Sequence, residues 1–250
     1  MKIVVLLFLL ALHSSAQESI TVGAGMYTQT QPYKNVDAII TPTPVVFYDN
    51  SLFYVRWTRI GMYFMGQSSD TFSWGASLTA QPRPLGYKEK SESSVEGMDQ
   101  RQGSFEGGVA LSCKYTFKNK NNIFAEILNL HDMMQRNNGY IVRAEVGSKI
   151  LYDKWSFYPS LLAIYHSENF NNYYYGVKES ETNNFRQAFN VSSGTDYAAQ
   201  TYINYEITSK YSLLFYTRLD KLSSQITASP IVTDEHFYSS MLSLIYTFKY

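Results

Sequence analysis

The residues that could do chemistry in this sequence are its histidines and the serines near them. His131 and His236 stand at predicted loop edges, and His166 ends a predicted strand directly before Ser167. A serine hydrolase needs a histidine within hydrogen-bond reach of the serine, and a third group that orients the histidine. Adjacent residues on a strand point to opposite faces, so His166 and Ser167 are not expected to face each other. His236 and Ser240 share a face but stand more than ~12 Å apart along a strand.

Motifs for metal, phosphate and redox chemistry are missing from the sequence. It has no metal-ligand spacing, no glycine-rich phosphate loop and no CxxC pair. The single cysteine, Cys113, has no partner for an internal disulfide and is expected to be a small packing residue on the lipid face. A formal net charge of zero gives no electrostatic reason to bind nucleic acid. We therefore expect no enzyme, no cofactor, no metal and no nucleic-acid partner.

A secretory signal is predicted for residues 1–16. Lys2 supplies a positive charge, and residues 3–12 form an apolar run that is too short to span a bilayer as a helix. Small residues in "HSSA" precede a cleavage point that we place after Ala16. Residues 17–250 are then expected to form one exported domain.

The exported part consists of long segments in which apolar and polar residues alternate. The clearest segment, residues 140–152, places Val142 and Ala144 on one face and Arg143 and Glu145 on the other. Such segments are about twice the length of an ordinary globular strand, whereas a tilted strand needs roughly 9–11 residues to cross a bilayer. The chain is also rich in aromatic residues, with 22 Tyr and 15 Phe, which favour strands and membrane boundaries. An all-β, antiparallel transmembrane β-barrel is the predicted fold.

Short and long connections alternate along the chain, as in outer-membrane barrels with short periplasmic turns and long external loops. The short turns are residues 49–51, 67–70, 118–122, 153–154 and 208–210, and the long segments are residues 29–37, 82–103, 131–138, 167–196 and 223–235. The alternation fails once, because residues 52–65 contain no long loop. Bacterial barrels have an even number of strands. We therefore predict that the chain folds back near residues 57–60, which gives twelve strands, with ten as the alternative.

Charged residues of both signs follow the polar faces and are expected to point into the barrel. The candidates for lining a pore are Arg143, Glu145, Lys149, Glu206 and Arg218. The alternative is that acidic and basic side chains pair with one another and fill the lumen. Eight-stranded barrels are filled and sixteen-stranded barrels hold a channel, so twelve strands leave both alternatives open.

The last segment, "LSLIYTFKY", has an apolar or aromatic residue at every second position. A closed barrel needs its last strand to pair with its first, so that no edge is left open. An alternating last strand that ends on an aromatic residue is also what the outer-membrane assembly machinery of Gram-negative bacteria recognises. We predict that Tyr246, Phe248 and Tyr250 form this assembly signal, and that the partners include outer-membrane lipid and the assembly machinery.

The external loops are the expected place for recognition. Residues 167–196 carry "NNYYYG", and tyrosine beside asparagine is a common composition for contact surfaces. The candidates are Tyr173, Tyr174 and Tyr175. The alternative is that these tyrosines fold over the barrel mouth.

Several stretches resemble the MipA/OmpV family, the MltA-interacting outer-membrane proteins of Gram-negative bacteria. They are "TVGAGMY", "GMDQRQGSFEGGVAL", "NNYYYGV", "TRLDKLSSQITASPIV" and "LIYTFKY", in the order of the family and spread over nearly the whole mature chain. The loop after "YYGV" departs from the family, since it is polar where the family is rich in alanine and glycine.

The resemblance implies an outer-membrane barrel and a scaffold that holds a lytic transglycosylase near a peptidoglycan synthase. Those two enzymes are the protein partners that it implies. A non-enzymatic envelope scaffold is our leading hypothesis for the function. A narrow porin-like channel for small solutes is the alternative from a different class, and a lipid hydrolase at the barrel rim is the third.

Overall fold

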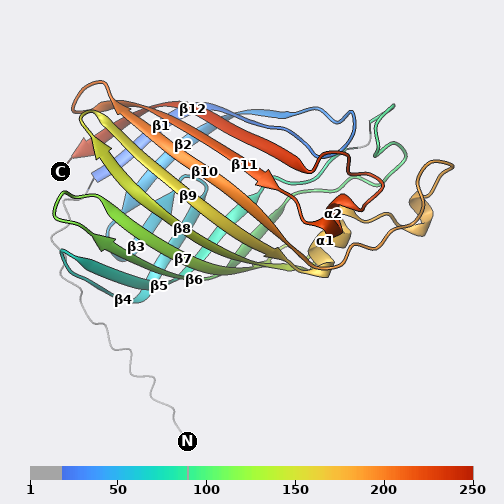
Figure 1. The fold of residues 1–250 in the computed structure, drawn as a ribbon, viewed down its shortest axis with the longest axis horizontal. Coiled ribbons are helices and arrows are strands. Elements are labelled where there is room, and N and C mark those ends of the chain that lie inside the picture. Colours follow the sequence, from blue (N-terminus) through green and yellow to red (C-terminus); the bar gives the residue numbers. More distant parts are fainter. Residues whose placement is uncertain (1–18, 89, 250) are drawn as a thin grey trace, which may run out of the picture.

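The computed structural model describes residues 19–88 and 90–249, and in these residues the strands form one closed antiparallel barrel (Figure 1). The twelve strands of the described chain are β1 (Ser19–Gln29), β2 (Ile39–Asp49), β3 (Phe53–Arg56), β4 (Arg59–Ser68), β5 (Phe72–Arg83), β6 (Ser104–Thr116), β7 (Asn122–Asp132), β8 (Tyr140–Tyr152), β9 (Trp155–His166), β10 (Gly194–Glu206), β11 (Tyr211–Lys221) and β12 (His236–Lys249). Each strand pairs with its neighbours in the chain, and β12 closes the barrel on β1. The predicted fold class and the strand number of twelve are confirmed.

The predicted reversal near residues 57–60 is a tight hairpin between β3 and β4. Arg56 of β3 pairs with Arg59 of β4, and Trp57 and Thr58 form the turn. Trp57 adopts a φ of 58°, a left-handed conformation that is rare outside glycine and is tolerated here in the turn. β3 is far shorter than the other strands, with only 4 residues.

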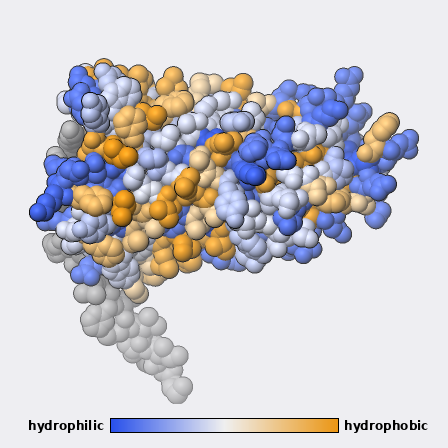
Figure 2. All heavy atoms as spheres, in the orientation of Figure 1, coloured by the Kyte–Doolittle hydropathy of each residue, from blue (hydrophilic) through white to orange (hydrophobic). Residues whose placement is uncertain are grey.

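The outer face of the barrel carries the apolar half of each alternating strand. Val146, Leu161 and Leu242 are 63%, 69% and 58% exposed. Figure 2 shows apolar residues across the middle of the visible wall and hydrophilic residues at both ends of the barrel. Because so large an apolar surface is rare on proteins that meet only water, the band marks the wall as a surface for lipid.

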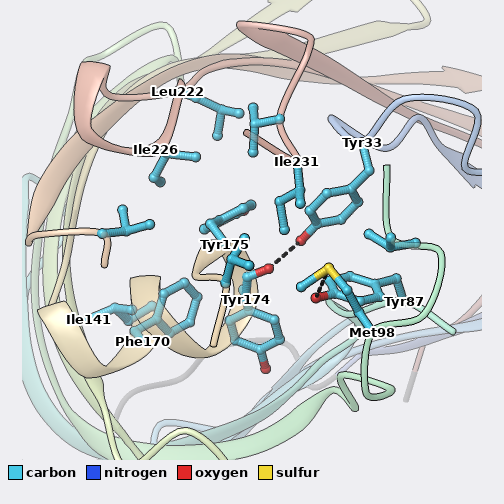
Figure 3. Packing of buried hydrophobic residues seen from close by; sticks show 14 of the residues in the cluster. Tyr33, Tyr87, Met98, Ile141, Phe170, Tyr174, Tyr175, Leu222, Ile226 and Ile231 are labelled. Atoms are coloured by element: carbon cyan, nitrogen blue, oxygen red, sulfur yellow. Dashed lines mark hydrogen bonds between the residues drawn. The ribbon is translucent and has the colours of Figure 1, made fainter. Parts of the chain in front are cut away.

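The largest buried apolar cluster lies at the end of the barrel that carries the long loops. Three short helical elements fold there: α1 (Glu168–Tyr175), η1 (Glu179–Glu181) and α2 (Ser224–Thr227). Ser167 caps α1, since its hydroxyl accepts a hydrogen bond from the backbone N–H of Phe170. Side chains of α1 and α2 pack with loop residues and with the parts of β6, β7 and β8 that lie toward the long loops (Figure 3). We call this assembly of loops and helices the cap.

Residues 1–16, the predicted signal, and Tyr250 of the predicted assembly signal lie outside the described residues. Within residues 19–88 and 90–249, no helix is long and apolar enough to cross a membrane.

Candidate functional site

The lumen of the barrel is the candidate site, and Glu126 on β7 is the centre of its charge network. Arg59 donates two hydrogen bonds to this carboxylate, at 2.6 and 2.9 Å. Arg56 and Arg143 add one bond each, at 3.2 and 3.1 Å. The Glu126 side chain is only 7% exposed. A carboxylate so buried needs this compensation, because an unpaired charge inside a protein is very costly.

Further charges in the lumen are paired in the same way. Glu145 accepts hydrogen bonds from Ser160 at 2.7 Å and from Gln200 at 2.9 Å. Arg218 is bound to Asp220, two residues along β11 and therefore on the same face. Each of these acidic side chains thus has a donor partner. Acidic side chains are therefore paired in this part of the lumen.

Arg83 and Glu106 form a separate pair near the cap. The Arg83 guanidinium donates to both oxygens of Glu106, one of them at 2.9 Å. The guanidinium carbon Cζ of Arg83 lies 5.6 Å from the ring centre of Phe170. Glu106 is 2% exposed. This pair therefore connects the barrel wall to the helix α1 of the cap.

Despite the paired charges, the lumen retains a cavity of about 2410 Å³. Four of the five predicted pore residues line it, namely Arg143, Glu145, Lys149 and Arg218. The cavity extends down to the end with the short turns, where Asn50, Ser68 and Asn122 line it. The fifth candidate, Glu206, is exposed at the last position of β10 and is not among the residues that line the cavity.

The cap closes the opposite end of the lumen. Tyr33 donates a hydrogen bond to the backbone oxygen of Tyr174 at 3.0 Å, and Tyr87 approaches the sulfur of Met98 (Figure 3). Ser94 in turn donates to the backbone oxygen of Ile231 at 2.7 Å. Two of these bonds join long loops that are far apart in sequence, the loop after β1 to the connection after β9 and the loop after β5 to the loop after β11, over the barrel mouth.

A buried ion pair and a second arginine fix the outer part of the cap. Arg101 donates to both oxygens of Glu181, at 2.8 and 2.7 Å, and both side chains are 3% exposed. Burial opposes ionisation of Glu181, but the hydrogen bonds from Arg101 hold the pKa of its carboxyl below the ordinary value. Arg186 donates to the backbone oxygens of Ser94, Glu96 and Glu181.

The predicted recognition tyrosines need a correction, because two of them are inside the cap. Tyr174 and Tyr175 are 0% and 2% exposed. Tyr173 is partly buried, and its hydroxyl accepts a hydrogen bond from the backbone N–H of Gln102 at 3.0 Å. The helix α1 turns these rings toward the barrel axis, where they bury a large aromatic area. The alternative in which the tyrosines cover the mouth is the one that the structure supports.

The candidate hydrolase residues do not form a serine–histidine pair. The imidazole of His166 lies 3.3 Å from Asp196 and stacks on Phe170 at 4.5 Å. Ser167 points instead to backbone donors, since its oxygen accepts from Tyr140 at 2.9 Å as well as from Phe170. Among the described residues, no serine hydroxyl is recorded as a hydrogen-bond partner of His166.

The last strand carries the described part of the predicted assembly signal. Tyr246 pairs with Val22 of β1 and with Tyr211 of β11. Its ring lies 4.6 Å from that of Phe248, and Phe248 is exposed on the outer face. Cys113 is also exposed, on the same face as its cross-strand neighbour Trp74.

Two features of the lumen escaped prediction from the sequence. The first is the pairing of Arg59 with Glu126. Arg59 directly follows the hairpin turn, so the sequence could not show whether its side chain points into the lumen or toward the lipid until the turn was located. The second is the pair of His166 and Asp196, whose positions at the ends of β9 and β10 become neighbours only through the register of these strands. The register could have been found by aligning the two strands across the long connection, with Ile164 opposite Asp196.

The closed barrel, its apolar outer band and its capped polar lumen define an outer-membrane β-barrel protein. The family model described as MltA-interacting protein MipA matches residues 22–248. The chain therefore belongs to this family, and the resemblance seen in the sequence is confirmed. The protein lies in the outer membrane, as the names of its relatives state.

The relatives are distant but mostly match over their full length. Outer membrane protein YiaT of Escherichia coli strain K12 is 27% identical over 254 residues, which cover 98% of each chain. The MltA-interacting protein of the same strain is 24% identical over 239 residues, 94% of this chain and 92% of the relative. OmpV of Vibrio cholerae is 27% identical over 169 residues, 68% and 63% of the two chains.

Among solved structures, the chain is similar to outer-membrane channels at low sequence identity. The COG4313 outer membrane channel from Pseudomonas putida F1 matches with a TM-score of 0.47 and 12% identity, over 94% of this chain and 97% of the channel.

Proposed function

We propose that the protein is a non-enzymatic scaffold of the outer membrane, which binds a lytic transglycosylase and holds it near a peptidoglycan synthase. The observation that carries the proposal is the family match over residues 22–248, together with a relative named MltA-interacting protein that aligns with 94% of this chain. A murein enzyme works in the periplasm. Its binding site on the barrel must therefore lie at the end with the short turns.

The chemistry of that end suggests how a partner would be held. Exposed lysines stand in three of the short turns, namely Lys118, Lys120, Lys154 and Lys210. They stand among the exposed carboxylates Asp49, Asp70 and Asp153 of the short turns, and each lysine can pair with an acidic group of a partner surface. The binding should accordingly weaken as the salt concentration rises.

The test is a binding measurement with a purified lytic transglycosylase and the barrel in nanodiscs. Lys118→Glu, Lys120→Glu and Lys154→Glu are combined in one variant, and we expect at least about a tenfold lower affinity, or roughly 1.4 kcal/mol. The matched control reverses Lys34 and Lys88, two exposed lysines of the long loops, and should bind like the wild type. Failure of the wild type to bind any murein enzyme from a periplasmic extract would remove the proposal.

A narrow channel is the second candidate, favoured by the cavity of about 2410 Å³ that reaches the periplasmic end. Planar-bilayer recordings of refolded protein test it. A pore predicts reproducible single-channel steps whose ion selectivity changes in Arg143→Gln and Glu145→Gln. A plugged lumen predicts no such steps, and only a loss of stability in the two variants.

A further inference from the structure

The barrel wall is interrupted between β2 and β5. β3 pairs with β2 only at Phe47, Tyr48 and Asp49. Residues 39–46 of β2 have no strand partner on the side away from β1 among the described strands. On the opposite side, β4 reaches only as far as Ala80 of β5, so that residues 81–83 pair with β6 alone. We call this gap, above the hairpin turn at Trp57 and Thr58, the window.

The sequence "TPTP" of residues 41–44 keeps the free edge of β2 from pairing. The backbone oxygen of Val46 accepts a hydrogen bond from Trp57 at 2.9 Å and therefore points toward the window. Both backbone polar groups of a strand residue point to the same side, and the side alternates along the strand. Pro42 and Pro44 consequently share the orientation of Val46 and offer no N–H to the window.

The carbonyl groups on this edge also have local partners. The hydroxyl of Thr41 donates to the oxygen of Pro42, and that of Thr43 to the oxygen of Pro44, each at 3.3 Å. An edge with missing donors and covered acceptors costs less in a membrane than an ordinary open edge, where each unsatisfied group is expensive. The sequence of residues 41–44 therefore allows the edge of β2 to stay unpaired at the window.

The cavity of the lumen extends into the window. Thr41, Pro42 and Thr43 line it from β2, and Gln81 and Pro82 line it from β5. Pro42 stands opposite Met26, which is half-exposed on the outer wall. At the window, the cavity of the lumen is therefore also lined by a residue of the outer face of the barrel, Pro42.

The window is bounded on every side by described residues. Trp57 forms its lower edge, where the indole N–H donates to Thr43 at 3.1 Å. Above it, the loops join through an ion pair of Lys90 and Asp37 at 2.8 Å and a hydrogen bond from the Asn35 amide to the backbone oxygen of Glu92. The loops of the cap cover the mouth, whereas the wall is open in its outer half.

We propose that the window is a lateral passage for small, neutral, amphipathic molecules between the outer leaflet of the membrane and the lumen. Its outer surroundings are apolar, with Ile40 68% exposed beside Pro42. Its inner rim offers hydroxyl and amide groups, from Thr41 and Gln81. The acidic groups at the centre of the lumen are already paired, so a cationic molecule finds no free counter-charge there. This inference is independent of the scaffold role.

Tryptophan fluorescence can test the passage, because Trp57 stands at the window. The chain has 3 tryptophans, and Trp74 and Trp155 are replaced by phenylalanine to leave Trp57 as the only reporter. The Trp57 ring packs on Tyr27 and Tyr216, at 5.5 and 5.6 Å, on the lumen side of the wall. Bromodecanol, a neutral amphiphile that partitions into vesicles and quenches tryptophan on contact, is the probe. A second reporter, Tyr158→Trp without the native tryptophans, reports on the lumen itself.

The window is narrowed by Thr41→Phe with Gln81→Phe, two side chains that line the cavity from opposite edges. The matched control is Ile40→Phe with Ala80→Phe, which adds the same volume at the neighbouring positions on the outer face. The heat-modifiable gel mobility of each variant shows whether it has folded.

We expect bromodecanol to quench both reporters, and the rate of quenching at Tyr158→Trp to fall several-fold in the narrowed barrel but not in the control. Equal quenching in the narrowed barrel and the control would overturn the passage, because the probe would then reach the lumen from the periplasmic end. Quenching of Trp57 without quenching of the lumen reporter would also overturn it, since the window would then hold lipid without connecting to the lumen.

Discussion

Glu126→Gln is the substitution that tests the lumen network most severely. It keeps the shape of the side chain but removes the charge that faces Arg56, Arg59 and Arg143, at distances of 2.6 to 3.2 Å. Removal of one partner from a buried ion pair costs about 3–5 kcal/mol, because the other charge remains buried without compensation. Arg143 retains Glu145 at 3.5 Å and Arg56 retains Asp49 at 3.4 Å, so we expect the lower end of this range, about 3 kcal/mol.

The assay is urea unfolding of the barrel in lipid vesicles, followed by heat-modifiable gel mobility. With a slope of about 2 kcal/mol per molar urea, a loss of about 3 kcal/mol lowers the midpoint by about 1.5 M. The control is Glu206→Gln, which removes an exposed carboxylate at the end of β10 and should change the stability by less than about 0.5 kcal/mol. Equal midpoints for Glu126→Gln and the wild type would refute the reasoning, because the lumen charges would then be hydrated and not dependent on one another.

Three further predictions concern the cap and the last strand. Tyr174→Ala removes a fully buried ring, and we expect it to cost about 3–5 kcal/mol of cap stability and to open the cap to protease, whereas Tyr173→Ala should have a smaller effect. Acidification should loosen the cap, because folding lowers the pKa of the Glu181 carboxyl, whose stabilising contribution is present above its ordinary pKa and is lost as the pH falls through the lowered value. Limited proteolysis of the cap as a function of pH measures this loss. The acid sensitivity should be absent in Glu181→Gln, whose cap is already less stable at neutral pH. Phe248→Ala should slow assembly into the outer membrane in pulse-chase experiments, because it removes an exposed ring at the end of β12, while Leu242→Ala on the same face should assemble normally.

The fold was predictable because the period of two in the strands is regular. Arg143 and Glu145 are in the lumen and Val146 is on the lipid face, as the alternation requires. The reversal at Trp57 could be placed only through the rule of even strand number, and the short length of β3 had no signal of its own. Pro42 and Pro44 did carry a signal for an unpaired strand edge, since proline is rare inside a sheet.

The cap was not predictable from the same patterns. Tyr174 and Tyr175 have a composition that fits both a contact surface and a buried core. Their burial depends on where α1 docks, which follows from contacts with loops up to 141 residues away in sequence, such as the bond from Tyr33 to Tyr174. The local sequence pattern does not predict such long-range packing.

Photo-crosslinking from the two ends of the barrel tests the proposed function most directly. A photo-reactive amino acid is placed at Asn119, in the short turn between β6 and β7, or at Gln135, in the long loop between β7 and β8. The account predicts that a lytic transglycosylase is crosslinked in cells from Asn119 and not from Gln135. Absence of a crosslink from Asn119 and from the neighbouring periplasmic turns would contradict it.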